Sequence, residues 1–162
     1  VPAYHDGEIA LWDSLAICEH LAERFPEAGL WPAEPSARAT ARSVVAEMHS
    51  SFVALRMHMP MNLRASYPGA GFEPGVDENI ARITAIWEGC RTKYGARGDL
   101  LFGGFTIADA FYAPIVSRFL TYGVSPGGIA GEYMDAVWAL PAMRDWAEKA
   151  RAEEWSVERY DR

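Results

Sequence analysis

The stretch FTIADAFYAPIVSRFLTYG, residues 105–123, is the strongest local signal in the sequence. Thr106 is followed three residues later by Asp109, which is the spacing of a capping box. In that motif each side chain binds a backbone N–H group that the helix start leaves free. The first turn is otherwise almost wholly apolar, which predicts a helix at the centre of the fold. We therefore expect Thr106 and Asp109 to be structural cap residues without a catalytic role.

Apolar residues recur at three-to-four spacing through most of the chain after residue 37. Pro and Gly interrupt this pattern over residues 66–76, so two antiparallel helices joined by a loop are expected on either side of the break. Pro141 suits the first position of a last helix. The predicted helices, besides the one at 105–123, run from Ala37 to Met59, from Asp77 to Tyr94, through Tyr133 to Trp138 and from Pro141 to Ala150.

The first 26 residues have a different pattern. VPAYHDGEIA, residues 1–10, predicts two short strands around Asp6-Gly7, a dipeptide that favours a tight turn. From Ser14 the apolar spacing is helical until Pro26, which predicts about three helical turns. The Pro-rich residues that follow break both periods and indicate a linker. We expect an α/β unit over residues 1–26, a linker over 27–37 and an all-helical domain over 38–162.

Composition excludes several classes of protein. The chain of 162 residues has 15 basic and 22 acidic side chains, a net charge of −7, whereas a nucleic-acid binder needs a dense Lys/Arg surface. It contains no apolar run long enough to span a membrane and no signal-peptide pattern, so we expect a cytoplasmic protein. Cys18 and Cys90 are expected to be small buried or half-buried thiols. The histidines lack metal-ligand spacing, so no metal is expected.

The order of these features resembles a known family. The motif LWDSLAICEHLAERFP at residues 11–26 is preceded by Val-Pro, a short strand, an Asp-Gly turn and a second strand. The motif FTIADAFYAP follows at residues 105–114. The combination resembles the cytosolic glutathione transferases, and a bacterial branch in particular, over essentially the whole chain. The resemblance implies a mainly α fold. A partial thioredoxin-like α/β N-terminal domain, a hairpin plus one helix, would be followed by the all-helical C-terminal domain of that family.

The resemblance also implies a function. A glutathione transferase conjugates or reduces electrophilic apolar compounds with the glutathione thiolate, which suggests a role in detoxification. In the family the Val-Pro bond is cis, and the residue before Pro binds the cysteinyl backbone of glutathione, while an acid-Ser pair at a helix start binds its γ-glutamyl end. The implied glutathione-binding residues are Val1, Pro2, Asp13 and Ser14; the candidates for the apolar substrate are Met48, Phe52, Met57 and Phe111.

One part of the family pattern has no counterpart here. The residue that activates the glutathione thiol follows the first strand of the thioredoxin-like domain, and that strand with the next helix and strand would precede Val1. No residue of the chain matches this role, and Cys18 does not. The alternative is a non-catalytic module for dimerisation, ligand binding or partner binding; an unrelated helical domain is the third reading. The resemblance further implies a homodimer through residues 37–59 and 77–94, with Arg38 and Arg42 near its interface.

Overall fold

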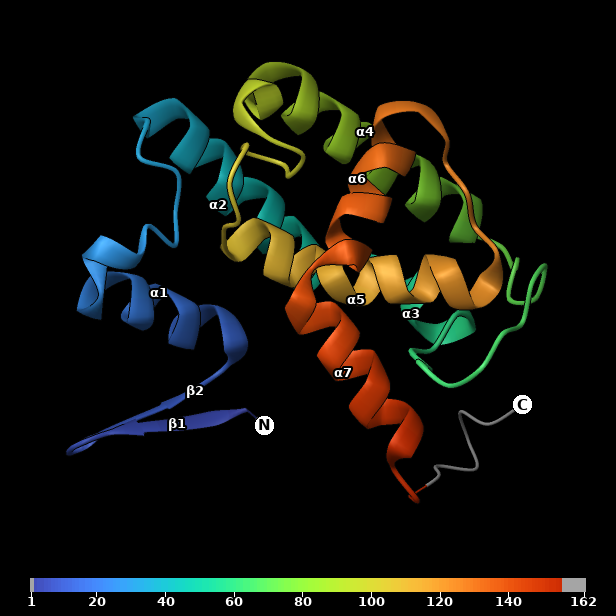
Figure 1. The fold of residues 1–162 in the computed structure, drawn as a ribbon, viewed down its shortest axis with the longest axis horizontal. Helices are drawn as coiled ribbons and strands as arrows, with labels where there is room; N and C mark the ends of the chain where they lie inside the picture. The colour runs from blue at the N-terminus through green and yellow to red at the C-terminus, as the bar shows by residue number, and fades with distance from the viewer. Residues whose placement is uncertain (1, 156–162) are drawn as a thin grey trace.

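The computed structural model describes residues 2–155, which form a short hairpin followed by helices (Figure 1). Two short 3₁₀ helices connect the main elements, η1 (Pro26–Ala28) after the first helix and η2 (Gly95–Arg97) after the fourth. The described strands and α-helices are β1 (Ala3–Asp6), β2 (Ile9–Trp12), α1 (Ser14–Arg24), α2 (Pro35–Ser50), α3 (Val53–His58), α4 (Val76–Tyr94), α5 (Ile107–Tyr122), α6 (Gly128–Ala139) and α7 (Pro141–Ala152).

The predicted hairpin is present at the N-terminal side of the molecule. Strands β1 and β2 pair antiparallel, with Ala3 opposite Trp12 and Asp6 opposite Ile9. The turn is therefore Gly7-Glu8, one residue later than the Asp6-Gly7 dipeptide suggested. Gly7 has a φ of 60°, a left-handed conformation that glycine adopts without a steric penalty.

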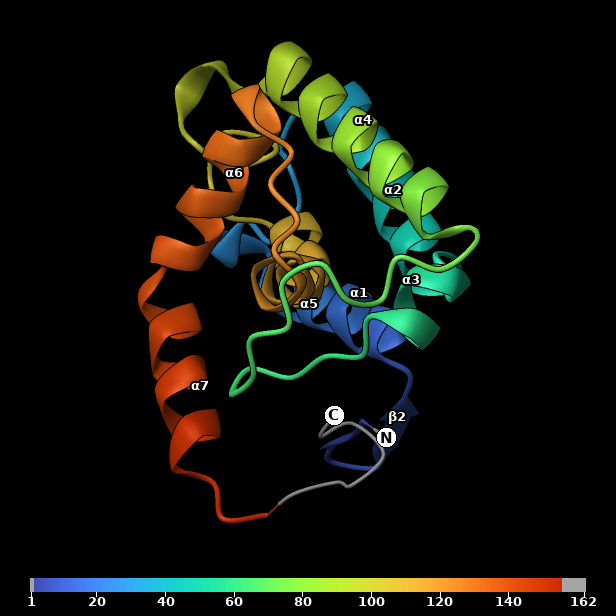
Figure 2. The same cartoon turned by 90° about the vertical axis from the view of Figure 1, so that its right-hand side faces the viewer.

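Helix α5 lies at the centre of the helical part, as its apolar sequence predicts. Figure 2 shows it almost end-on, with α2 and α4 on one side and α6 and α7 on the other. Thr106 and Asp109 form a capping box at its start, and the backbone N–H of Thr106 donates to Asp109 Oδ2 at 2.8 Å. Asp109 Oδ1 also accepts from the N–H of Leu101 at 3.1 Å. The buried carboxylate therefore joins the preceding loop to the helix start.

An aromatic cluster fills the space between α4, α5 and α6. Trp87 of α4 is fully buried, and its ring centroid lies 5.9 Å from that of Tyr112, 5.4 Å from Phe119 and 4.9 Å from Tyr133. The four side chains come from three helices, α4, α5 and α6. Burial of such large rings is the main favourable contribution to folding in this part of the chain.

The single helix predicted from Ala37 to Met59 is wrong, because the structure breaks it into α2 and α3. Phe52 lies at the break with a φ of 61°, a left-handed conformation that ends one helix and redirects the next. Burial of its side chain in the core holds this conformation, since only 5% of Phe52 is exposed. Arg56 supports the break by donating from Nε to the Ser51 carbonyl at 3.0 Å.

Helices α2 and α4 are antiparallel, as the sequence predicts. Thr40, near the start of α2, lies 3.0 Å (Oγ1 to OH) from Tyr94 at the end of α4. Glu47, near the end of α2, accepts from Arg82 Nε at 2.7 Å. The start of α2 therefore lies beside the end of α4, and the end of α2 beside the first half of α4. Figure 2 shows the two helices side by side.

Helix α1 packs on the helical part with one face only. Its apolar residues Leu15, Cys18 and Ala22, spaced by three and four positions, contact the core of α2 to α7. No residue of the two strands or of α1 is itself fully buried. The fold is mainly α, with a partial thioredoxin-like unit joined to a helical domain, as the sequence predicts.

Candidate functional site

Helix α1 begins where the sequence places an acidic residue beside a serine. Asp13 is the N-cap, and its Oδ1 accepts from the backbone N–H groups of Leu15 at 2.9 Å and Ala16 at 3.2 Å. These bonds, together with the charge of His49, hold the pKa of the Asp13 carboxyl below its usual value. Ser14 is the first residue of the helix and not its cap. Its neighbour is thus a carboxylate that stays ionised at neutral pH.

Asp13 also joins α1 to the helical domain. Its second oxygen, Oδ2, lies 2.8 Å from Nε2 of His49 at the end of α2. The ring of His49 in turn meets the edge of Phe111 on α5, with centroids 6.0 Å apart. Asp13 has a φ of 80°, an unfavourable conformation for a residue with a side chain. Three elements that are distant in sequence therefore converge at the start of α1.

A cleft of about 480 Å³ opens beside this point, between α1 and the helical domain. Its walls come from α1, the end of α2, α3, α5 and the chain after α3. They combine apolar, sulfur-containing and cationic side chains, and none of them is acidic. The lining residues are Ser14, Cys18, Met48, His49, Arg56, Met61, Ala110, Phe111, Pro114 and Arg118.

The structure brings together part of the predicted site. Ser14, Met48 and Phe111 line the cleft, and Asp13 reaches it through His49. Pro2 is exposed, ahead of strand β1. Val1 lies outside the described residues.

Two of the predicted apolar-substrate residues do not line the cleft. Phe52 is turned into the core by the left-handed break between α2 and α3 and is only 5% exposed. Met57 lies on the outer face of α3 and is 65% exposed. The sequence analysis treated residues 37–59 as one continuous helix, on which Phe52 continues the stripe of Met48. The break between α2 and α3 turns Phe52 into the core instead.

The sequence analysis missed three nitrogen-bearing side chains that line the cleft: His49, Arg56 and Arg118. Arg118 donates from Nε to the Met59 carbonyl and from Nη1 to the Pro114 carbonyl, both at 3.0 Å. Burial, aided by the charge of Arg56, lowers the pKa of Arg118 to about 10, so it remains charged at neutral pH. A signal for it was present, because Arg118 is the only basic residue in the apolar helix α5.

Neither thiol of the chain has the environment of a reactive cysteine. Cys18 lines the cleft, but burial and the charges of Glu19 and Asp13 raise the pKa of its thiol. Burial raises the pKa of Cys90 to about 11. Both thiols therefore stay protonated at neutral pH, in agreement with the structural role expected of them.

Residues 2–155 show neither a metal site nor a membrane-spanning helix. They contain no group of three or more His, Cys, Asp or Glu side chains placed to hold a metal ion. Within the same range no helix is long and apolar enough to cross a membrane.

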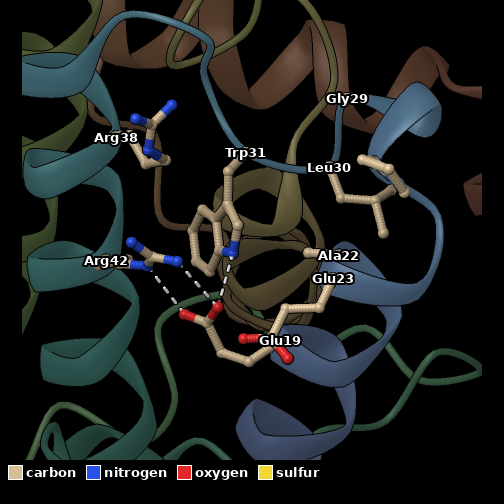
Figure 3. Close-up of a pocket in the computed structure, with 9 residues that line it drawn as sticks. Glu19, Ala22, Glu23, Gly29, Leu30, Trp31, Arg38 and Arg42 are labelled. Carbon is tan, nitrogen blue, oxygen red and sulfur yellow. Dashed lines mark hydrogen bonds and ion pairs between the residues drawn. The ribbon is translucent and has the colours of Figure 1, made fainter.

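A second, smaller pocket of about 200 Å³ lies nearer the C-terminal end of α1 (Figure 3). Glu19 of α1 accepts from Nε and Nη2 of Arg42 at 2.9 and 3.1 Å, and from Trp31 Nε1 at 3.1 Å. The guanidinium of Arg42 also lies over the Trp31 ring, 5.6 Å from its centroid. Because these polar groups satisfy one another, we interpret the cluster as a structural contact between α1 and α2.

The same cluster bears on the residues expected near a dimer interface. Arg42 is engaged within the chain by Glu19. Arg38 donates from Nη1 to the carbonyls of Pro32 at 3.0 Å and Ala33 at 2.9 Å. Both arginines thus hold the segment between α1 and α2 in place.

Comparison with known proteins supports the family that the motifs suggested. No family model matches the chain. Over 120 residues it is 29% identical to glutathione S-transferase Z2 of Arabidopsis thaliana, a match that covers 70% of this chain and 51% of the plant protein. The chain thus spans about half the length of this curated relative.

Solved structures share the fold. A Burkholderia glutathione transferase homolog with bound glutathione superposes with a TM-score of 0.67 at 23% identity, over 95% of this chain and 74% of that one. Maleyl pyruvate isomerase, a bacterial zeta-class glutathione S-transferase, gives 0.67 at 23% identity, over 97% and 76%. Glutathione transferase F2 of Populus trichocarpa gives 0.66 at 19% identity, over 94% and 76%.

The fold is that of a thioredoxin-like unit joined to an all-helical domain, with a cleft at their junction. The chain resembles a curated glutathione transferase in sequence and several solved ones in fold, in agreement with the resemblance carried by its two motifs.

Proposed function

We propose that the chain binds glutathione at the start of α1 and acts in an enzyme that conjugates or reduces electrophilic apolar compounds. The observation that carries this proposal is the position of Ser14. It is the first residue of α1, next to the ionised Asp13, and it lines one end of the cleft. A helix N-terminus with a free hydroxyl is a suitable site for a carboxylate.

The γ-glutamyl end of glutathione carries both a carboxylate and an ammonium group. In the proposed complex the carboxylate accepts hydrogen bonds from the hydroxyl and backbone N–H of Ser14. The ammonium approaches the Asp13 carboxylate, whose Oδ2 is held by His49 in the structure. Val1 and Pro2 are proposed to bind the cysteinyl backbone, as the family resemblance implies.

The thiolate would then face the apolar part of the cleft. Met48 and Phe111 supply a wall for the second substrate there. With an aryl halide, the sulfur–carbon bond forms while the carbon–halogen bond breaks, and the halide leaves with the electron pair. We assign the thiol-activating role to no residue of this chain, since the protonated Cys18 is not suited to it.

A non-catalytic ligand-binding module is the second candidate function. The observation that favours it is the chemistry of the cleft wall, where Ser14 is the one hydroxyl and Cys18 the one thiol among the described lining residues. A module of this kind would bind glutathione and would not turn it over.

Calorimetric titration with glutathione tests the proposal. We expect saturable binding that the Ser14→Ala variant weakens about tenfold, because a hydrogen bond to a charged group contributes roughly 1.5–3 kcal/mol. Ser43→Ala is the matched control, since Ser43 lies exposed on α2 and donates to the Ala39 carbonyl. Absence of binding, or equal effects of the two variants, would contradict the proposal. Binding without conjugation of an aryl halide would favour the non-catalytic module.

We further propose a homodimer in which α2 and α4 supply the interface, and a cytoplasmic location, both on the family resemblance. Sedimentation equilibrium tests the first point. A species of twice the chain mass is expected at high concentration, and a monomer over the whole range would contradict it.

A further inference from the structure

Two arginines line the cleft without a carboxylate partner among the described residues. Arg56 comes from α3 and Arg118 from α5, and both line the cleft. Within residues 2–155 neither forms an ion pair with a carboxylate; each binds backbone carbonyls instead. Outside the cleft, Arg24, Arg42 and Arg82 have a carboxylate partner. Arg38 and Arg91 bind backbone carbonyls there, but neither of them lines the cleft.

Each of the two guanidinium groups keeps hydrogen-bonding capacity. Arg56 donates through Nε to Ser51 and through Nη2 to the Met48 carbonyl. Arg118 uses Nε and Nη1 for the carbonyls of Met59 and Pro114. Nη1 of Arg56 and Nη2 of Arg118 therefore have no protein partner in the described part of the chain. The carbonyls fix both side chains in position, so an incoming group meets preorganised donors.

The two positive charges also act on each other. The charge of Arg56 contributes, after burial, to the lowered pKa of Arg118, which shows that they lie close enough to interact. Two like charges on the wall of a partly buried cleft are unfavourable unless an anion joins them. No acidic side chain lines the cleft, and Asp13, next to the lining residue Ser14, is engaged by His49. An anionic ligand would offset this repulsion.

The remaining wall indicates the body of that ligand. Met48, Met61, Phe111 and Pro114 give the cleft an apolar surface beside the arginines. Methionine and phenylalanine side chains favour contact with a flat aromatic or an extended apolar group. At about 480 Å³ the cleft is within the usual range for small-molecule sites.

We propose that the second substrate of this cleft is an electrophile with a carboxylate on an aromatic body, and that Arg56 and Arg118 bind the carboxylate. Phe111 and Met48 contact the ring. This inference rests on the proposed function for the assignment of the ligand as a second substrate. It replaces the purely apolar electrophile expected from the sequence with an anionic one.

The test compares two ligands that differ in charge. The full 162-residue chain is titrated in a calorimeter with a chloronitrobenzoate and with the corresponding neutral benzamide, without glutathione. We expect the benzoate to bind about tenfold more tightly, the effect of one charge-assisted hydrogen bond pair, and to lose this advantage as salt is added. Arg56→Gln and Arg118→Gln should each reduce the preference severalfold. Arg144→Gln, an equal change of charge on the exposed face of α7, should leave it unchanged.

Arg118→Lys is the second variant at this position, because Arg118→Gln could unfold the chain by removing the donors to two backbone carbonyls. The lysine keeps the positive charge. It should retain most of the preference that Arg118→Gln removes, and Arg56→Gln reports independently if the Arg118 variants lower the melting temperature. Equal affinity for the two ligands, no binding of the benzoate, or a preference that survives in both glutamine variants would overturn the inference. Because glutathione is absent, a failure of glutathione binding would count against the proposed function alone.

Discussion

The hairpin with α1 and the helical part from α2 to α7 differ in how they are stabilised. No residue of β1, β2 or α1 is fully buried, whereas α4, α5 and α6 share a cluster of aromatic rings with no exposure. The first region is held by one apolar helix face and by polar contacts such as Glu19–Arg42 and Asp13–His49. The Asp13–His49 contact lies beside the cleft. The stable core and the recognition site therefore belong to different parts of the fold.

The largest expected effect comes from exchanging a tryptophan in each region. Trp87→Ala removes a fully buried ring from the aromatic cluster and should lower the free energy of unfolding by about 3–5 kcal/mol. Trp12, on β2, is 75% exposed, so Trp12→Ala should change it by less than about 0.5 kcal/mol. Urea denaturation of both variants measures the difference. Similar losses in the two would show that the hairpin shares the core.

The capping box of α5 should have the next largest effect. Asp109→Ala leaves the buried N–H groups of Thr106 and Leu101 without an acceptor, so we expect a loss of about 3 kcal/mol of stability. Asp145→Ala is the control, because Asp145 is exposed on α7 and pairs only with Lys149 among the described residues. Thermal denaturation gives the comparison. A loss below about 0.5 kcal/mol would mean that water replaces the carboxylate at no cost.

A smaller and more local effect is expected at the contact between α1 and α2. Glu19→Ala removes the acceptor of Arg42 and of Trp31 Nε1. Because Arg42 is half exposed, we expect a coupling energy of about 0.5–1 kcal/mol in a double-mutant cycle of Glu19→Ala and Arg42→Ala. Amide exchange should accelerate in α1 and stay unchanged in α5. An equal acceleration in both helices would contradict the separation of the two regions.

The smallest predicted effect is the loss of amide protection at the start of α1 in acidic solution. The pKa of Asp13 is lower in the folded chain, so the stabilisation of the α1 start is complete above the ordinary pKa of an aspartate. It is lost as the pH falls through the lowered folded value. Amide exchange at Leu15 and Ala16 should therefore lose protection in strongly acidic solution, and in Asp13→Asn the loss should not depend on pH. A loss that begins near neutral pH would contradict the assignment of the effect to Asp13.

Much of the fold could be predicted from the sequence, because local signals and tertiary structure agree there. The Thr106-to-Asp109 spacing, the apolar stripes of α4 and α5 and the two-strand signal each reappear as elements with nearby bounds. The break at Phe52 could not be predicted, since the apolar spacing continues through it. Its left-handed backbone is favoured only once the ring is buried by residues distant in the sequence.

The candidate site was harder to predict than the fold. Asp13, Ser14, Met48 and Phe111 could be named because they belong to motifs or stripes. Arg56 and Arg118 could not be combined from the sequence, because they are 62 positions apart and meet only when α3 and α5 pack. The role of Asp13 as the cap in place of Ser14 depends on side-chain geometry that spacing does not show.

The central claim is that glutathione binds at the start of α1, on the cleft between the two regions. Titration of the ¹⁵N-labelled chain with glutathione, followed by amide chemical shifts, tests it most directly. We predict that the largest shift changes occur at Ser14, Leu15 and Ala16, with smaller ones at His49, and that Ser14→Ala reduces them. Changes confined to the Trp31 and Arg42 pocket, or no changes at all, would contradict the account.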